Sequence, residues 1–134
     1  MIKPHVFYLD PSNTLNAMAD IIGRYLSTGL MLESIKTLTF TSETAAEFYR
    51  EHLKERFFPE LAEEMTFDQC VAMIFVGENA VQKVREINGV TNPAEALPGT
   101  LRHKYGIKKK GPRNAVHGSD SLESAEREIK VIFS

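Results

Sequence analysis

The feature that most constrains the fold of this chain is a continuous apolar run, Cys70–Val76, just past its midpoint. A run of this length is typical of a buried strand. A helix that crosses a bilayer needs about 18 or more apolar residues, and no stretch of the sequence approaches that length. We therefore expect a globular fold with an interior strand and no membrane association.

The composition is that of an ordinary globular domain, with 43% hydrophobic and 25% charged residues. The 134 residues suit a single domain, residues 1–134. A formal charge of −2 argues against a surface that coats nucleic acid. The lone Cys70 excludes an intrachain disulfide and a multi-cysteine metal site, and it is compatible with a reducing cytoplasm. No secretory signal or internal repeat is visible.

Helical and strand patterns alternate around the central run. Residues 2–7 read as the end of a strand; because only two residues precede Lys3, that strand is either shortened or the chain starts late. Residues 30–40 read as a second strand. Helical patterns cover residues 15–26, 42–53, 59–65, 80–87 and a C-terminal stretch from about Ser121. This order predicts an α+β fold.

A candidate nucleophile, His117, lies just ahead of the last helix. Gly118 follows it, and Ser119, Asp120 and Ser121 all favour a helix N-cap. The expected apolar stripe is Leu122, Ala125 and Ile129, with Glu128 at its edge and able to turn towards the histidine. A carboxylate on one ring nitrogen leaves the other free to act as a nucleophile. From the residues alone, a buried, hydrogen-bonded histidine in a capped loop explains the pattern equally well.

Residues 89–113 form a long irregular stretch that includes Lys108-Lys109-Lys110. Loops this long are usually functional or mobile, and the lysine run favours a solvated loop over a nucleic-acid patch. The chain has no glycine-rich phosphate loop and no His-Glu-x-x-His metal motif. Nucleotide phosphates would therefore be held by scattered cations.

The run Arg113-Asn114-x-x-His117-Gly118-Ser119-Asp120-Ser121, followed by Glu123-Ser124-Ala125-Glu126-x-Glu128-Ile129, resembles the active-histidine signature of nucleoside diphosphate kinases. The resemblance extends over nearly the whole chain. It implies a ferredoxin-like, four-stranded antiparallel sheet with helices packed on one face. It also implies transfer of the terminal phosphate of ATP to a nucleoside diphosphate by a ping-pong mechanism through phosphohistidine on His117.

The same resemblance assigns roles to individual residues. The implied catalytic residues are His117, Lys3, Tyr49, Ser119 and Glu128. The implied nucleotide-binding residues are Lys3, His52, Phe57, Leu61, Arg85, Thr91, Arg102 and Asn114. Mg²⁺ would travel on the nucleotide phosphates without a direct protein ligand, and Asp120 would contact its water shell. A cytoplasmic homo-oligomer, a tetramer or hexamer built from dimers, is implied as well, with no specific nucleic-acid partner.

Some positions depart from the family pattern. His5 stands where the family has aspartate, and Phe67-Asp68-Gln69 replaces Ser-Gly-Pro. The loop around Lys108–Pro112 carries extra residues. Two further functions therefore stay open: a nucleotide-binding or interaction module with weak or lost turnover, and a protein phosphotransferase that uses the same histidine.

Overall fold

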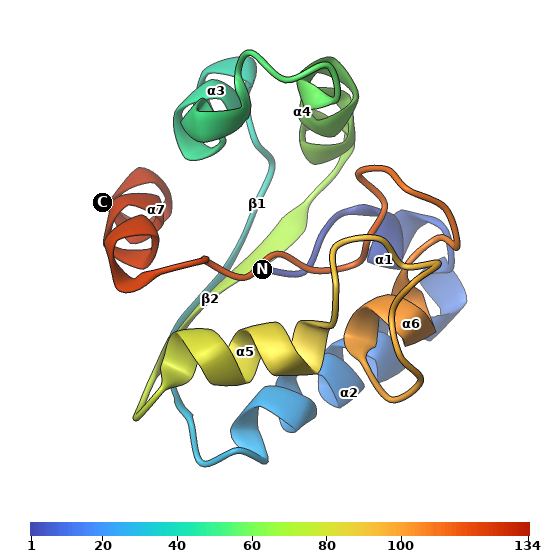
Figure 1. The fold of residues 1–134 in the computed structure, drawn as a ribbon, viewed down its shortest axis with the longest axis vertical. Coiled ribbons are helices and arrows are strands. Elements are labelled where there is room, and N and C mark those ends of the chain that lie inside the picture. The colour runs from blue at the N-terminus through green and yellow to red at the C-terminus, as the bar shows by residue number, and fades with distance from the viewer.

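The computed structural model describes residues 1–134 and contains two antiparallel strands surrounded by helices (Figure 1). In chain order the elements are α1 (His5–Tyr8), η1 (Pro11–Asn13), α2 (Thr14–Leu26), β1 (Met31–Leu38), α3 (Ser42–Phe48), η2 (Arg50–His52), α4 (Phe58–Phe67), β2 (Cys70–Val76), α5 (Ala80–Asn88), α6 (Leu101–Tyr105) and α7 (Leu122–Phe133). The α+β class predicted from the sequence is confirmed. None of the helices combines the length and the apolar character that a bilayer crossing requires.

The N-terminal residues lie against the free edge of β2. Strand β1 pairs with one edge of β2, with Ile35 opposite Met73. On the other edge of β2, Ile2 forms a single bridge to Val71. Ile2 also forms a single bridge to Val116, which precedes His117. Residues 1–3 therefore run between β2 and the segment that leads to His117, at the centre of the molecule (Figure 1). These contacts are isolated bridges, so the sheet itself has two strands.

Helices cover both faces of the sheet, so the expectation that they lie on one face is wrong. Val71 belongs to a buried cluster with Ile21 and Tyr25 of α2. Its neighbours Cys70 and Ala72 belong to a second cluster, formed mainly by α3, α4 and α7. Because successive strand residues point to opposite faces, β2 separates two cores.

The short helix α1 corrects the reading of residues 2–7 as the end of a strand alone. Pro4 lies at the N-cap of this helix with helical dihedral angles, a position where its missing amide proton costs nothing. Helix α6 likewise falls within residues 89–113, which we expected to be irregular; the side chain of Thr100 caps it by accepting a hydrogen bond from the amide of His103.

Helix α7 begins where the sequence predicted, because the Ser121 hydroxyl accepts the Ser124 amide at 3.0 Å. Its inner face differs from the prediction. Leu122 is 74% exposed and Ile129 is 36% exposed, whereas Ser124, Glu128 and Ile132 are buried. The face of α7 that the rest of the fold covers is therefore the one that carries the carboxylate of Glu128, not the more apolar one.

Candidate active site

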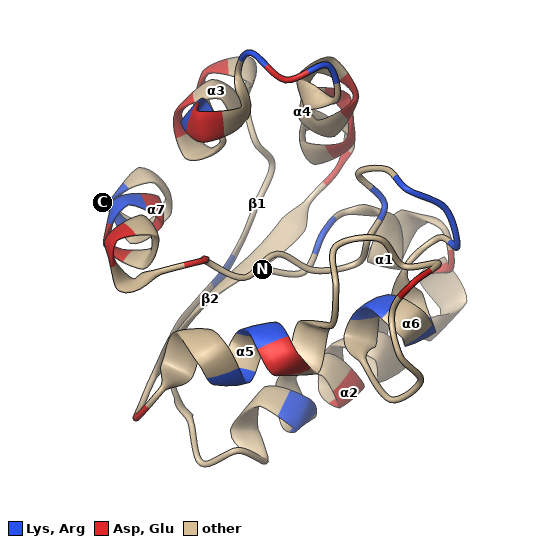
Figure 2. Cartoon of the chain, viewed as in Figure 1, with Lys and Arg blue, Asp and Glu red and all other residues tan.

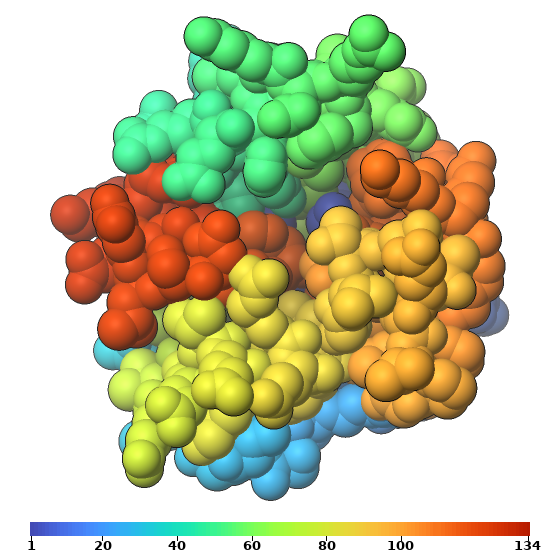
Figure 3. Space-filling model, viewed as in Figure 1, coloured from blue at the N-terminus to red at the C-terminus, as the bar shows by residue number.

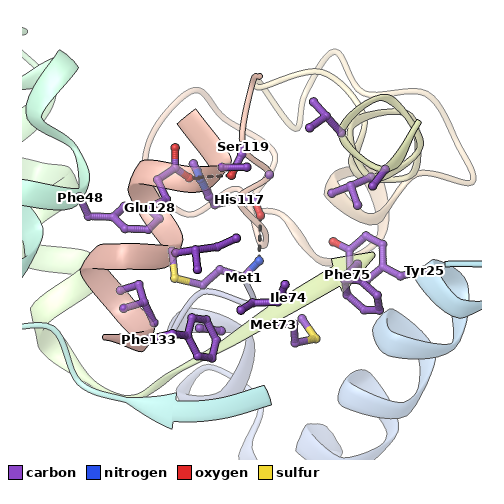
Figure 4. A pocket seen from close by; sticks show the side chains of 18 residues that line it. Met1, Tyr25, Phe48, Met73, Ile74, Phe75, His117, Ser119, Glu128 and Phe133 are labelled. Carbon is purple, nitrogen blue, oxygen red and sulfur yellow. Dashed lines mark hydrogen bonds and ion pairs between the residues drawn. The ribbon is translucent and has the colours of Figure 1, made fainter. Parts of the chain in front are cut away.

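A hydrogen-bonded group of three side chains joins the segment before α7 to the inner face of that helix. Nε2 of His117 lies 2.5 Å from Oε1 of Glu128, and the hydroxyl of Ser119 donates to the same oxygen at 2.9 Å (Figure 4). The sequence placed all three in one site, and the structure brings them together.

The two nitrogens of the His117 ring have different surroundings. Nε2 is engaged by Glu128, whereas Nδ1 takes part in no hydrogen bond. The side chain is 23% exposed, so reagents can reach it. Because a nitrogen held by a carboxylate carries the proton, Nδ1 has the free lone pair.

The charge state of the pair favours a neutral ring. Burial lowers the pKa of His117, and the Met1 ammonium and Lys3 add to this, while Glu128 acts in the opposite direction. Burial by itself raises the pKa of the Glu128 carboxyl, but its bonds from His117 and Ser119 outweigh this and leave it below its usual value. At neutral pH the site therefore holds a carboxylate and an unprotonated Nδ1.

Aromatic rings line one side of the histidine. Tyr49 meets its ring edge-on, with centroids 5.8 Å apart. From Tyr49 the row continues to His52 at 6.4 Å and from there to Phe57 at 5.3 Å. Phe57 is 46% exposed at the outer end, whereas Leu61 is buried in the core. The buried Tyr49 hydroxyl has no hydrogen-bond partner, and burial raises its pKa.

Two cationic side chains, Lys3 and Arg102, lie near His117. The ammonium of Lys3 donates to the carbonyl of Pro112 at 3.0 Å. Its side chain is buried, and this burial together with the nearby Arg102 lowers the pKa of Lys3 to about 7. Arg102 donates to the carbonyl of Gly89 at 2.8 Å and to the carbonyl of Val116, beside the histidine, at 2.9 Å.

Three other predicted residues surround this pair of cations. Asn114 is buried and donates from Nδ2 to the carbonyl of Thr91 at 3.1 Å, while its Oδ1 has no partner. Arg85 is exposed on α5, and its Cγ lies 3.9 Å from the position that a Cβ on Gly118 would occupy. Figure 3 shows a hollow between the α3–α4 region and the segment near residue 90, with N-terminal atoms visible at its base.

The chain packs closely against α5 at Gly118. A Cβ at this position would lie 2.9 Å from Nδ2 of Asn88 and 3.0 Å from Cγ1 of Val84, both on α5. Real Cβ atoms essentially never come closer than 3.0 Å to another heavy atom. The glycine therefore lets the segment that joins His117 to α7 lie close against α5.

The charged surface near the site has two parts. Basic residues follow one another along the loop after α6, whereas α3 and α4 carry many acidic residues (Figure 2). Lys108, Lys109 and Lys110 are exposed on that loop, as is Asp120 at the start of the segment that leads into α7. No group of three or more histidine, cysteine or acidic side chains is arranged to hold a metal ion.

Comparison with known proteins assigns the family. A model of the family "Nucleoside diphosphate kinase" matches residues 1–134. The chain belongs to the nucleoside diphosphate kinase family. Among curated members, it is 46% identical over 119 residues to the nucleoside diphosphate kinase of Persephonella marina, covering 89% of this chain and 84% of the relative. It is 44% identical over 117 residues to that of Archaeoglobus fulgidus, covering 87% and 76%.

Solved structures of nucleoside diphosphate kinases have the same fold as this chain. The enzyme of Aquifex aeolicus superposes with a TM-score of 0.89 at 39% identity, over 99% of this chain and 91% of that one. The enzyme of Encephalitozoon cuniculi in its apo form gives a TM-score of 0.87 at 33% identity, over 98% and 84%. The resemblance inferred from the histidine signature is confirmed.

An apolar cavity of about 130 Å³ borders the His117–Glu128 pair of this nucleoside diphosphate kinase family member (Figure 4). Met73 and Phe75 of β2, Val84 of α5 and Phe133 of α7 are among its lining residues. Apolar walls keep water from Glu128 and strengthen its interaction with the histidine ring. The cationic residues of the site do not line this cavity, so they and the apolar wall flank the pair separately.

Sequence reasoning missed two side chains of the site. The ring of Phe48 meets His117 edge-on at 5.0 Å. Arg127 donates to the carbonyl of Phe48 at 3.0 Å and lies 3.5 Å from Oε2 of Glu128. The sequence carries no signal for this, because neighbouring residues on a helix usually face different directions.

Proposed function

We propose that this chain transfers the terminal phosphate of ATP or another nucleoside triphosphate to a nucleoside diphosphate, with Nδ1 of His117 as the intermediate acceptor. The single observation that carries the proposal is the asymmetry of the imidazole. Its Nε2 is held by Glu128, while Nδ1 is free of hydrogen bonds and the ring is partly exposed.

The proposed reaction has two matched halves. The Nδ1 lone pair attacks the terminal phosphorus, and an N–P bond forms as the P–O bond to the departing diphosphate breaks. The diphosphate oxygen keeps the electron pair of that bond. A second nucleoside diphosphate then attacks the phosphohistidine in the reverse sense, and His117 is restored. Glu128 stabilises the ring as its positive charge develops.

Stabilisation of the transferring phosphoryl group is assigned to Lys3, Arg85 and Arg102. Phosphoryl transfer depends chiefly on positioned positive charge, because the protein has little covalent chemistry to supply. Lys3 supports this role because its ammonium is held only by the Pro112 carbonyl, which a phosphate oxygen can replace. Tyr49 and Ser119 are assigned to holding His117 and Glu128 in place.

The nucleoside is assigned to the outer end of the aromatic row. Phe57 is exposed enough for a base to stack on it, and His52 lies beside it. Phe57 is the N-cap of α4, and Leu61 anchors that helix in the core. Stacking accepts any base, since every base has a π-face. Asn114, whose buried Oδ1 lacks a donor, is assigned to a ribose hydroxyl, with Thr91 next to it.

We propose that Mg²⁺ enters as part of the nucleotide substrate. In proteins that act on nucleotides, Mg²⁺ is usually bound through substrate phosphates and one or two carboxylates rather than by an all-protein cage. Asp120, an exposed carboxylate, is assigned to the water shell of such an ion. A cytoplasmic location is part of the same proposal; the free, buried thiol of Cys70 is compatible with it.

We further propose a single domain with a ferredoxin-like, four-stranded sheet and assembly into a dimer-based tetramer or hexamer. The bridges of Ile2 to Val71 and Val116 support two additional short strands. The outer edge of β1 has no strand beside it and carries Met31 and Ile35, which are 68% and 46% exposed. An unpaired edge with apolar side chains favours pairing between copies. Light scattering after gel filtration measures the assembly.

A labelling experiment tests the proposal. The native chain, incubated with γ-labelled ATP and Mg²⁺, should form an acid-labile phosphoenzyme that GDP discharges. His117→Gln should take up no label. His103→Gln is the matched control, because His103 bonds to the Ala96 carbonyl at 3.1 Å and has no assigned role, and it should label normally.

Each other outcome points elsewhere. An unlabelled native chain leaves only the nucleotide-binding module, and label on His117→Gln overturns the choice of nucleophile. Label that passes to a protein but never to GDP favours the protein phosphotransferase.

A further inference from the structure

The peptide that leads into His117 contains a tight turn in a strained conformation. The amide of Val116 donates to the carbonyl of Asn114, two residues earlier, at 2.8 Å. Ala115, between them, has a φ of 71°. This is a γ-turn with positive φ, a rare arrangement that is unfavourable for any residue with a Cβ. Such a turn persists only where its surroundings hold it.

Two hydrogen bonds from the N-terminal segment hold this turn. The carbonyl of Ala115 accepts the amide of Lys3 at 2.9 Å. The amide of Ala115 donates to Nε2 of His5 at 2.8 Å. Ala115 is 0% exposed and His5 is 1% exposed, so water cannot replace either bond. The His5 ring is therefore the partner on which that buried amide depends.

Accepting this bond fixes the protonation of His5. A lone pair on Nε2 requires that the ring be neutral, with its proton on Nδ1. The residue is held in turn by Glu64, whose Oε1 accepts the backbone amide of His5 at 3.0 Å. Oε2 of Glu64 accepts the hydroxyl of Tyr8 at 2.7 Å, and Arg113 lies 3.5 Å from it. The backbone at His5 is thus held by a partly buried network around Glu64.

Both ends of the turn belong to the proposed active site. Its last carbonyl, that of Val116, accepts a hydrogen bond from Arg102, and the next residue is His117. Its first residue, Asn114, is bonded to Thr91. A shift of the turn would therefore move the nucleophile and the guanidinium relative to each other.

We infer that His5 is a positioning residue for phosphoryl transfer, in which its unprotonated Nε2 accepts the Ala115 amide and holds the strained turn that sets His117 against Arg102. This inference rests on the proposed function. It gives a role to the residue at which this sequence departs from the aspartate expected after Lys3-Pro4. A histidine nitrogen and a carboxylate oxygen share the property that matters here, since each accepts a hydrogen bond from an amide.

The test compares two substitutions at this one position. His5→Gln keeps an acceptor near the place of Nε2, whereas His5→Leu removes it at similar volume. Leu30→Ala, buried beside Gly77 at the opposite end of β2 from the Ile2–Val71 bridge, is a destabilised control outside the core cluster that holds the turn. Single-turnover phosphorylation of His117 is measured well below the unfolding temperature of each variant. We expect His5→Leu to be slower by at least about tenfold, since small misplacements of reacting groups have effects of this size or larger. His5→Gln should recover most of the rate, and Leu30→Ala should match the native chain.

Two kinetic outcomes overturn the inference: a folded His5→Leu variant that phosphorylates at the native rate, or a His5→Gln variant as slow as His5→Leu. If His5→Leu does not fold, ¹⁵N NMR of the native chain decides the question. We expect an unprotonated Nε2 on His5 and slow exchange of the Ala115 amide; a protonated Nε2 or a rapidly exchanging amide overturns the inference. Because NMR needs no turnover, a native chain that fails to label would sink the proposed function and leave this test intact.

Discussion

One oxygen of Glu128 serves two partners of unlike chemistry. Its Oε1 lies 2.5 Å from Nε2 of His117 and 2.9 Å from the hydroxyl of Ser119. The imidazole is therefore orientated by a charge whose own position is fixed by a neutral donor. The arrangement separates two contributions that substitution can measure independently: the charge of the carboxylate and its placement.

Replacing Glu128 by glutamine tests the charge. Glu128→Gln keeps an oxygen of similar position but removes the anion to which the proposed mechanism assigns stabilisation of the developing positive ring. A hydrogen bond to a charged group contributes about 1.5–3 kcal/mol, so we expect kcat to fall roughly 10- to 150-fold. Ser119→Ala keeps the anion and removes one hydrogen bond to it, so it disturbs the placement of Glu128 alone and should reduce kcat less, by about tenfold. Steady-state kinetics with ATP and a nucleoside diphosphate measure both. Equal losses in the two variants would contradict this division.

The turn at Ala115 predicts an unusual mutational pattern. Ala115→Val places a β-branched side chain at a φ of 71° in a position that is 0% exposed. Strain and overpacking together should lower the free energy of unfolding by about 2–4 kcal/mol. Ala115→Gly, which adopts this φ without strain, should stay within about 1 kcal/mol of the native chain. Urea denaturation measures both. A valine variant as stable as the glycine variant would show that the turn is not strained.

Much of the fold followed from local patterns. The predicted buried strand, Cys70–Val76, has the bounds of β2, and the cap at Ser121 set the start of α7. These features depend on residues close in sequence. The inner face of α7 was mispredicted because hydrophobicity favoured Leu122 and Ile129, whereas the face that the fold buries carries Ser124, Glu128 and Ile132. Only the tertiary arrangement decides which face of an amphipathic helix is covered.

The site was predictable only in part, for the same reason. The histidine signature identified the His117–Glu128 pair, whose members are 11 positions apart. The bond from Lys3 to the Pro112 carbonyl joins residues 109 positions apart, and the bond from Ala115 to His5 spans 110. No rule based on sequence spacing predicts a contact between residues so far apart in the chain. The role of His5 therefore emerged only from the structure.

Acidification should destabilise the chain through His5. Burial, with the charges of Lys3 and Arg113 adding to it, lowers the pKa of His5 from 6.5 to about 3. Because the unfolded chain then binds a proton that the folded chain excludes, stability is complete above pH 6.5 and falls as the pH drops towards 3. The loss from this one group is about 1.4 kcal/mol for each pH unit in that window. Urea denaturation between pH 4.5 and 7.5 measures the free energy of unfolding at each pH. Below pH 6.5 its slope against pH should be smaller in His5→Gln than in the native chain by about this amount. Parallel slopes in the two proteins would rule out a buried, neutral His5.

Lys3 should take up a proton when nucleotide binds above neutral pH. Burial and the charge of Arg102 lower its pKa to about 7, so a large fraction of the free protein carries an uncharged Lys3 at pH 8. The phosphates of a bound nucleotide favour the ammonium and raise that pKa, and the proton must come from solvent. Calorimetric titration of a nucleoside diphosphate in buffers of different ionisation enthalpy should show uptake of up to about one proton at pH 8 and little at pH 6. Lys3→Arg keeps a fixed charge and should abolish the uptake while the protein stays folded. Uptake that persists unchanged in Lys3→Arg would assign the proton to another group, such as His117, and would contradict the placement of Lys3 against the phosphates.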